Sequence, residues 1–124
     1  MSVTHPFGKA IEAGDDDAAL ATIADDVVFR SPAVHTPYEG KETVEGILRL
    51  VATVFESFRY TNEWRDGRTT ILFFEANVGA RELQGIDILE ENDEGKIAKF
   101  TVMIRPLSGL QAVARTMAER LGLS

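Results

Sequence analysis

Four consecutive segments in the second half of the chain have the composition and spacing of strands, and this run restricts the possible folds more than any other feature. The segments are residues 58–67, 69–80, 81–93 and 95–106. Turn-forming residues separate them, at Asp66-Gly67, near Gly79 and at Glu94-Gly95. Strands joined by such short connections pair with their neighbours in sequence. The sequence therefore predicts an antiparallel meander.

Most of the remaining chain has helical spacing, with apolar residues recurring at intervals of three and four. The predicted helices cover residues 5–14, 15–26, 41–58 and 107–122. A short strand is expected at 27–32, and a loop with two prolines at 31–40. Helices gathered against an antiparallel sheet indicate an α+β fold. A chain of 124 residues is expected to form a single domain, 1–124.

Composition argues against several classes of partner. The chain has 20 acidic and 13 basic residues and a formal net charge of −7, so we expect it to bind neither nucleic acid nor anionic membrane surfaces. It has no Cys, which excludes disulfides and thiolate chemistry. The N-terminus has no apolar run of signal-peptide length, and a soluble cytoplasmic protein is expected. His5 and His35 lack metal-ligand spacing, so we expect no metal ion.

Both faces of the predicted sheet are largely apolar. Alternate residues of a strand point to opposite faces. One set is Leu72, Phe74, Gly85, Asp87, Leu89, Phe100, Val102 and Ile104, and the other is Ile71, Phe73, Ile86, Ile88, Thr101 and Met103. A single layer of helices covers only one face, and a large exposed apolar patch is unusual. We favour a homodimer that packs sheet against sheet, although a C-terminal helix folded over the second face is an alternative.

Three stretches carry a resemblance to a known family. GDDDAALATIADDVVFRSP, PYEGKETVEGILR and GIDILEENDEGKI resemble the nuclear transport factor 2-like fold and, within it, the SnoaL-like group. The resemblance extends over nearly the whole chain. It implies a cone-shaped domain in which a curved antiparallel sheet wraps helices around a central cavity. It also implies dimers formed through the outer face of the sheet.

Ketosteroid isomerase shares this fold, so its catalytic residues can be compared with positions in this chain. The resemblance places Phe7 where that enzyme has a Tyr, Ser31 where it has its base Asp, and Asp87 where it has a protonated Asp. Only Asp87 matches, and isomerisation by that enzyme's route is therefore not expected. SnoaL-like cyclases use an acidic cavity residue without a cofactor, and Asp87 is compatible with that role. We accordingly expect no cofactor.

Asp87 lies at the centre of an otherwise apolar strand, and two interpretations are open. In the first, desolvation by its neighbours raises its pKa, so that the carboxyl donates a hydrogen bond to a ligand or transfers a proton. In the second, Asp87 bonds to a nearby hydroxyl or backbone N–H and only stabilises the sheet. We favour the first, because the family resemblance supports it.

Four further residues are candidates for the site. His35, in the proline-bounded loop, could act as an acid or base near neutral pH or be an exposed loop residue. Arg30 could pair with Asp87 or with a ligand carboxylate, or lie on the surface at a strand end. Tyr38 and Trp64 could bracket a ligand or serve only in packing. His5 is interpreted as a terminal residue without a role.

These observations lead to one functional hypothesis and two alternatives. The expected catalytic residues are Asp87 and His35, and the expected ligand-binding residues are Phe7, Arg30, Tyr38, Ile47, Trp64, Leu72, Phe74, Val102 and Ile104. The leading hypothesis is cofactor-independent acid/base conversion of a small, mostly apolar, carbonyl-bearing molecule, by isomerisation, cyclisation or hydration. The alternatives are a non-catalytic ligand-binding module and a protein-interaction domain.

Overall fold

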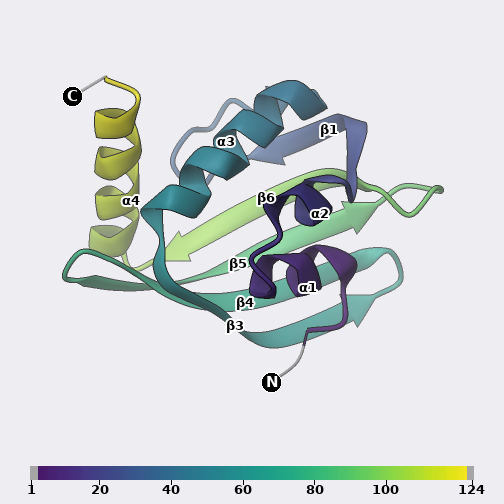
Figure 1. Ribbon diagram of the computed structural model, residues 1–124, viewed down its shortest axis with the longest axis horizontal. Helices are drawn as coiled ribbons and strands as arrows, with labels where there is room; N and C mark the ends of the chain where they lie inside the picture. The colour runs from purple at the N-terminus through teal and green to yellow at the C-terminus, as the bar shows by residue number, and fades with distance from the viewer. Residues whose placement is uncertain (1–2, 123–124) are drawn as a thin grey trace.

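A computed structural model describes residues 3–122 and shows one curved, unclosed sheet with helices packed against it (Figure 1). The strands are β1 (Ile23–Arg30), β2 (Tyr38–Glu39), β3 (Glu56–Asp66), β4 (Thr69–Val78), β5 (Arg81–Glu91) and β6 (Ile97–Arg105). The strand order is β2-β1-β6-β5-β4-β3. All pairs are antiparallel except β1 with β6. The predicted meander, which corresponds to β3 through β6, is confirmed.

The helices are α1 (Pro6–Glu12), α2 (Asp16–Leu20), α3 (Lys41–Val54) and α4 (Leu107–Arg120). The first three lie in front of the sheet in Figure 1, and α4 stands at one end of it. This arrangement confirms the predicted α+β class. The longest helices in residues 3–122 have 14 residues, and none is long and apolar enough to cross a bilayer.

The predicted helix at 15–26 is too long. The structure ends α2 at Leu20 and begins β1 at Ile23. The long-range bond from the Ile97 N–H to the Thr22 carbonyl, at 2.9 Å, fixes this point as the start of pairing with β6. Tertiary pairing therefore overrides the local helical spacing. The predicted 31–40 loop likewise contains a short strand, β2, which pairs with β1.

His5 is not a free terminal residue. Its side chain is 3% exposed, and its Nδ1 accepts the backbone N–H of Phe7 at 3.1 Å. This bond caps α1, because the first N–H groups of a helix have no partner within the helix. Pro6 occupies the first helical position, where its missing N–H costs nothing.

The register of the central strands decides which side chains face the helices. Leu72, Asp87 and Val102 lie side by side on β4, β5 and β6, and Phe74, Gly85 and Ile104 form the next row. Leu72, Phe74, Gly85 and Asp87 are buried under the helices, whereas Ile71, Phe73, Ile86 and Ile88 are only partly covered. The predicted division of the strand residues into two faces is confirmed.

We predict that Leu72→Ala lowers the free energy of unfolding by about 2–5 kcal/mol, because Leu72 is 0% exposed and its removal leaves a cavity. Asn77→Ala, on the opposite face of the same strand, is the matched control and should change stability by less than about 1 kcal/mol. Urea denaturation of both variants measures this. Equal losses would contradict the assignment of the two faces.

Candidate functional site

A cavity of about 570 Å³ lies between the inner face of the sheet and the helices. All four helices and all six strands contribute to its wall, together with the loop after β1. Most of the lining side chains are apolar. The polar exceptions are Asp16, Ser31, Tyr38, Arg49, Tyr60 and Asp87.

Asp87 and Tyr60 form the polar centre of the cavity wall. Asp87 projects from β5 and is 6% exposed, and Tyr60 projects from β3 and is 5% exposed. The Tyr60 hydroxyl donates a hydrogen bond to Asp87 Oδ2 at 2.8 Å. This bond spans β4, because Tyr60 opposes Phe74 and Asp87 opposes Leu72. The two residues therefore act as one hydrogen-bonded unit.

The environment changes the acidity of both groups. Burial raises the pKa of Asp87 from its usual 3.8 to about 7, and the Tyr60 hydrogen bond opposes that rise. Burial, together with the neighbouring Asp87 carboxyl, raises the pKa of Tyr60 well above its usual value. Asp87 is thus half-protonated near neutral pH, while Tyr60 stays neutral and donates.

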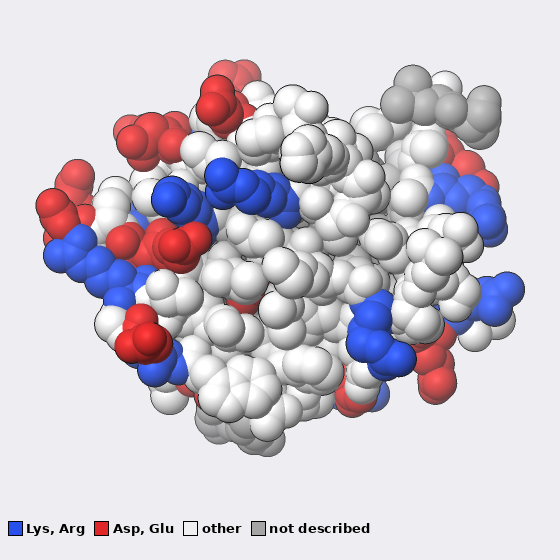
Figure 2. All heavy atoms as spheres, turned by 180° about the vertical axis from the view of Figure 1, so that it is seen from behind, with Lys and Arg blue, Asp and Glu red and all other residues white. Residues whose placement is uncertain are grey.

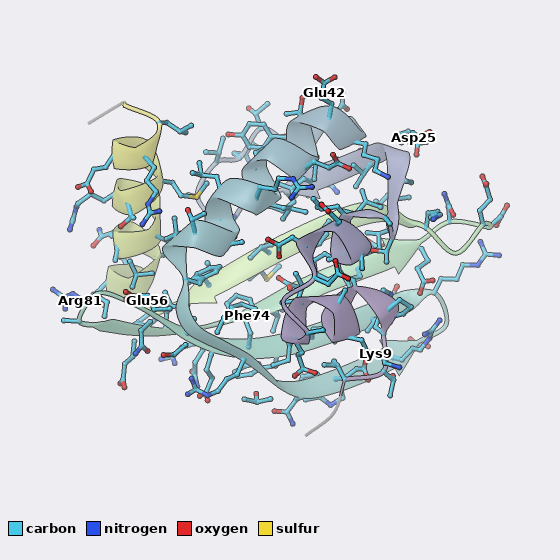
Figure 3. The ribbon with its side chains drawn as sticks, viewed as in Figure 1. Lys9, Asp25, Glu42, Glu56, Phe74 and Arg81 are labelled. Carbon is cyan, nitrogen blue, oxygen red and sulfur yellow. The ribbon has the colours of Figure 1, made fainter. Side chains whose placement is uncertain are left out.

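Aromatic rings pack against Tyr60 and against one another on this side of the cavity. Phe58 stacks on Phe74 with ring centroids 4.9 Å apart, and it meets Tyr60 edge-on at 5.0 Å. Phe55 packs against both Phe58 and Phe74. Phe74 lies on the inner face of the sheet near the middle of the molecule (Figure 3). Burial of the carboxyl in this largely apolar wall is the physical cause of its raised pKa.

Seven of the predicted site residues come together around the cavity. Phe7, Tyr38, Ile47, Phe74, Asp87, Val102 and Ile104 all line it. Leu72 faces the same side but is completely buried beneath α1. Its Cδ1 atom lies 3.1 Å from the position that a Cβ atom on Gly8 would take. It supports α1 and does not reach the cavity surface. A ligand-binding role for the seven lining residues stays a prediction.

Three predicted residues lie elsewhere. Trp64 is 54% exposed and opposes Ile71 on the outer face, so its assignment to the cavity is wrong. Arg30 is exposed and opposes Thr101, because it is the neighbouring Phe29 that faces the cavity. His35 lies exposed in the loop after β1 and is not among the cavity-lining residues. Neither Arg30 nor His35 pairs with Asp87.

Tyr60 belongs to the site although it is not among the residues predicted from the sequence. A signal for it was present, because Phe58 and Tyr60 alternate on the first strand of the meander. Simple alternation would also have placed Trp64 on the same face as Tyr60. A register shift between Tyr60 and Asn62 reverses the facing of later residues, so Tyr60 faces inward and Trp64 outward.

Ser31 also lines the cavity, but its hydroxyl serves the backbone. Its Oγ accepts the N–H groups of Ala33 at 3.0 Å and Val34 at 3.3 Å. The position therefore stabilises a turn and supplies no carboxylate base. Within residues 3–122, no group of three or more His, Asp or Glu side chains is placed to hold a metal ion.

Comparison with known proteins agrees with this fold. The model of the SnoaL-like domain family matches residues 5–100. No curated protein matches the chain. A solved structure described as a steroid delta-isomerase from Pseudomonas aeruginosa is 45% identical, with a TM-score of 0.87, and the match covers 91% of this chain and 84% of that one.

Two further solved structures are similar. An uncharacterized protein with a cystatin-like fold from Silicibacter pomeroyi is 29% identical, with a TM-score of 0.88, over 96% of this chain and 87% of that one. An NTF-2 like protein from Burkholderia xenovorans is 19% identical, with a TM-score of 0.69, over 86% of both chains, which shows the fold alone. With the family match over most of its length and this agreement in fold, the chain belongs to the SnoaL-like domain family and has the nuclear transport factor 2-like fold.

Proposed function

We propose that this domain binds a small, mostly apolar, carbonyl-bearing molecule in its cavity and converts it by acid/base chemistry without a cofactor. The observation that carries the proposal is the Tyr60–Asp87 hydrogen bond inside an otherwise apolar cavity. A cavity of about 570 Å³ is in the size range of sites for small organic ligands. An apolar wall with few polar groups suits a ligand that is itself largely apolar.

Asp87 is the acid in this proposal. The Tyr60 hydroxyl occupies Oδ2, so the proton of the neutral carboxyl is left to Oδ1. From there it can be donated to the carbonyl oxygen of a ligand. A hydrogen bond given in a water-excluded site stabilises negative charge that develops on that oxygen. A pKa of about 7 also allows Asp87 to give up and regain its proton near neutral pH.

Tyr60 is a positioning residue for Asp87. Its hydroxyl fixes the orientation of the carboxyl through the 2.8 Å bond, and it lowers the pKa of Asp87 from the still higher value that burial alone would produce. It therefore keeps the acid strong enough to release its proton. This role needs no contact between Tyr60 and the ligand.

The likeness to the Pseudomonas aeruginosa steroid delta-isomerase supports a polycyclic ketone as the ligand class. We do not choose between isomerisation, cyclisation and hydration. Ser31 stands where ketosteroid isomerase is expected to have its base, and a serine hydroxyl does not supply that carboxylate. A non-catalytic binding module is the second candidate. One observation favours it: Asp87 is the sole buried carboxyl among residues 3–122, so no second buried carboxyl is there to share the proton transfer.

We also propose that the outer face of the sheet packs against a second copy of this chain. Its centre carries two apolar rows, formed by Phe73, Ile86 and Met103 and by Trp64, Ile71 and Ile88. Polar rows flank them, including Arg59, Glu75, Gln84 and Arg105, which are joined by hydrogen bonds. Figure 2 shows this face as an uncharged area with charged side chains around its rim. An apolar centre with a polar rim is the usual anatomy of a protein interface.

Two substitutions of Asp87 separate binding from catalysis. Asp87→Leu removes the hydrogen bond and should weaken the binding of hydrophobic ketones, steroids or aromatic polyketides by about tenfold or more. Asp87→Asn keeps an N–H donor but has no acidic proton. The affinity of this variant for the ligand should stay within about tenfold of the native affinity, whereas its turnover rate should fall by about a hundredfold or more. Calorimetry and turnover assays measure both effects.

Asp26→Asn, at an exposed position on β1, is the matched control and should leave binding and turnover unchanged. If Asp87→Leu binds these ligands as well as the native protein, Asp87 does not contact them and the proposed function is wrong. If Asp87→Asn binds normally and no member of the panel is converted by native protein, the domain is a binding module.

Stability should depend on pH through Asp87. The carboxyl titrates near 3.8 in the unfolded chain and near 7 in the folded protein. Between these values the folded state holds a proton that the unfolded state has released, so the free energy of unfolding falls as pH rises, and it levels off above pH 7. Asp87→Asn lacks this proton. The stability of the variant relative to native should therefore rise by roughly 4 kcal/mol from pH 4 to pH 8.

Urea denaturation of both proteins at a series of pH values measures this difference. Taking the difference cancels the other titrating groups, which the two proteins share. A difference that stays constant with pH would show that Asp87 has an ordinary pKa.

The proposed dimer predicts a concentration-dependent mass. Met103→Glu places a charge at the centre of the face and should weaken association by about tenfold or more. Ser108→Glu makes the same change at an exposed position on α4 and should have no effect. Analytical ultracentrifugation tests both, and a native protein that stays monomeric at high micromolar concentration would rule the dimer out.

A further inference from the structure

We propose that Phe74 sets the ligand specificity of the cavity by closing it on the Tyr60 side of Asp87. The ligand's carbonyl must then lie at the end of the molecule. This inference rests on the proposed function, because it concerns the ligand that Asp87 binds.

Gly85 allows Phe74 to occupy this place. The two residues lie directly opposite each other on β5 and β4. A Cβ atom added to Gly85 would come within 2.4 Å of Phe74 Cζ and 2.6 Å of the Met103 carbonyl oxygen. The Phe74 ring therefore rests on bare backbone, and any larger residue at position 85 would force the ring away from the sheet.

Three further aromatic rings pack against the Phe74 ring. Phe58 stacks on it with an interplanar angle of 29° at 4.9 Å, and Phe55 packs on it at 5.7 Å. Tyr60 meets it edge-on, with centroids 6.5 Å apart. Phe74 is 1% exposed. Packed between the bare backbone at Gly85 and these rings, Phe74 cannot tilt aside to admit a ligand.

This fixed ring borders the reactive carboxyl. Asp87 follows Gly85 by two residues on the same face of β5, so it lies next to the site that Phe74 fills. On the other side of Asp87, Val102 and Ile104 on β6 are half-buried and line the cavity. A ligand that accepts a hydrogen bond from Asp87 therefore meets a wall of aromatic rings, Phe58, Tyr60 and Phe74, on the β3 side, and it extends towards β6 and α4.

Two isomeric ketones test this asymmetry. In 4-phenylcyclohexanone the carbonyl lies at the end of the molecule, and in 2-phenylcyclohexanone a phenyl group adjoins it. The isomers have the same composition, so a difference in affinity reports the shape of the site. We expect native protein to bind the 4-isomer at least about tenfold more tightly, as measured by calorimetry.

Replacing Phe74 should remove this preference. Phe74→Ala creates space beside Asp87, and the affinities for the two isomers should then agree within about threefold, chiefly because the 2-isomer binds more tightly. Phe74→Leu is a milder variant, in case the alanine protein fails to fold, and should reduce the preference in the same direction. Phe29→Leu removes another cavity-lining ring, on β1, and should weaken the binding of both isomers equally.

The outcomes separate this inference from the proposed function. If native protein binds neither ketone, nor the wider panel, the proposed function fails and the inference fails with it. If native protein binds both isomers equally, or if folded Phe74 variants keep the native preference, the proposed function stands and Phe74 is not its specificity determinant.

Discussion

The cost of placing a carboxyl group inside an apolar sheet is the constraint on which the site depends. Asp87 has Leu72 and Val102 beside it and is only 6% exposed, so the charged form is poorly solvated. Two responses are open to a buried acid: it can find a hydrogen-bond donor, or it can keep its proton. Asp87 does both, through Tyr60 and through a pKa near 7. The same penalty that weakens the folded state at high pH creates an acid that works near neutrality.

The curved sheet and the placement of the helices on it together create the cavity that holds Asp87. Helices α1, α2 and α3 cover the inner face, and α4 stands at its end, which leaves a cavity where a flat, fully covered sheet would leave none. The register shift after Tyr60 contributes directly. It turns Tyr60 towards Asp87 and sends Trp64 to the opposite face. A single irregularity in β3 thereby serves both the polar centre of the cavity and the apolar outer face.

The parts of this structure that follow from local pattern could be predicted from the sequence. The meander, the two faces of β4, β5 and β6, and the inward position of Asp87 all depend on alternation within single strands. Arg30 and Trp64 were misplaced for another reason, since their facing depends on pairing and register between strands. Neither β1's partner nor the shift in β3 leaves a clear local signal. The end of α2 was missed likewise, because β6 fixes it from more than 70 residues away.

The protonation state of Asp87 is the central claim, and a carbon-13 NMR titration of its side-chain carboxyl carbon tests it most directly. Comparison with Asp87→Asn assigns the resonance, and Tyr60→Phe reports the contribution of the hydrogen bond. A midpoint near 7 in the native protein, which rises further when the Tyr60 hydroxyl is removed, is the predicted result. A midpoint near 4 would mean that the carboxyl is ionised at neutral pH, and the role of Asp87 as a proton donor would be contradicted.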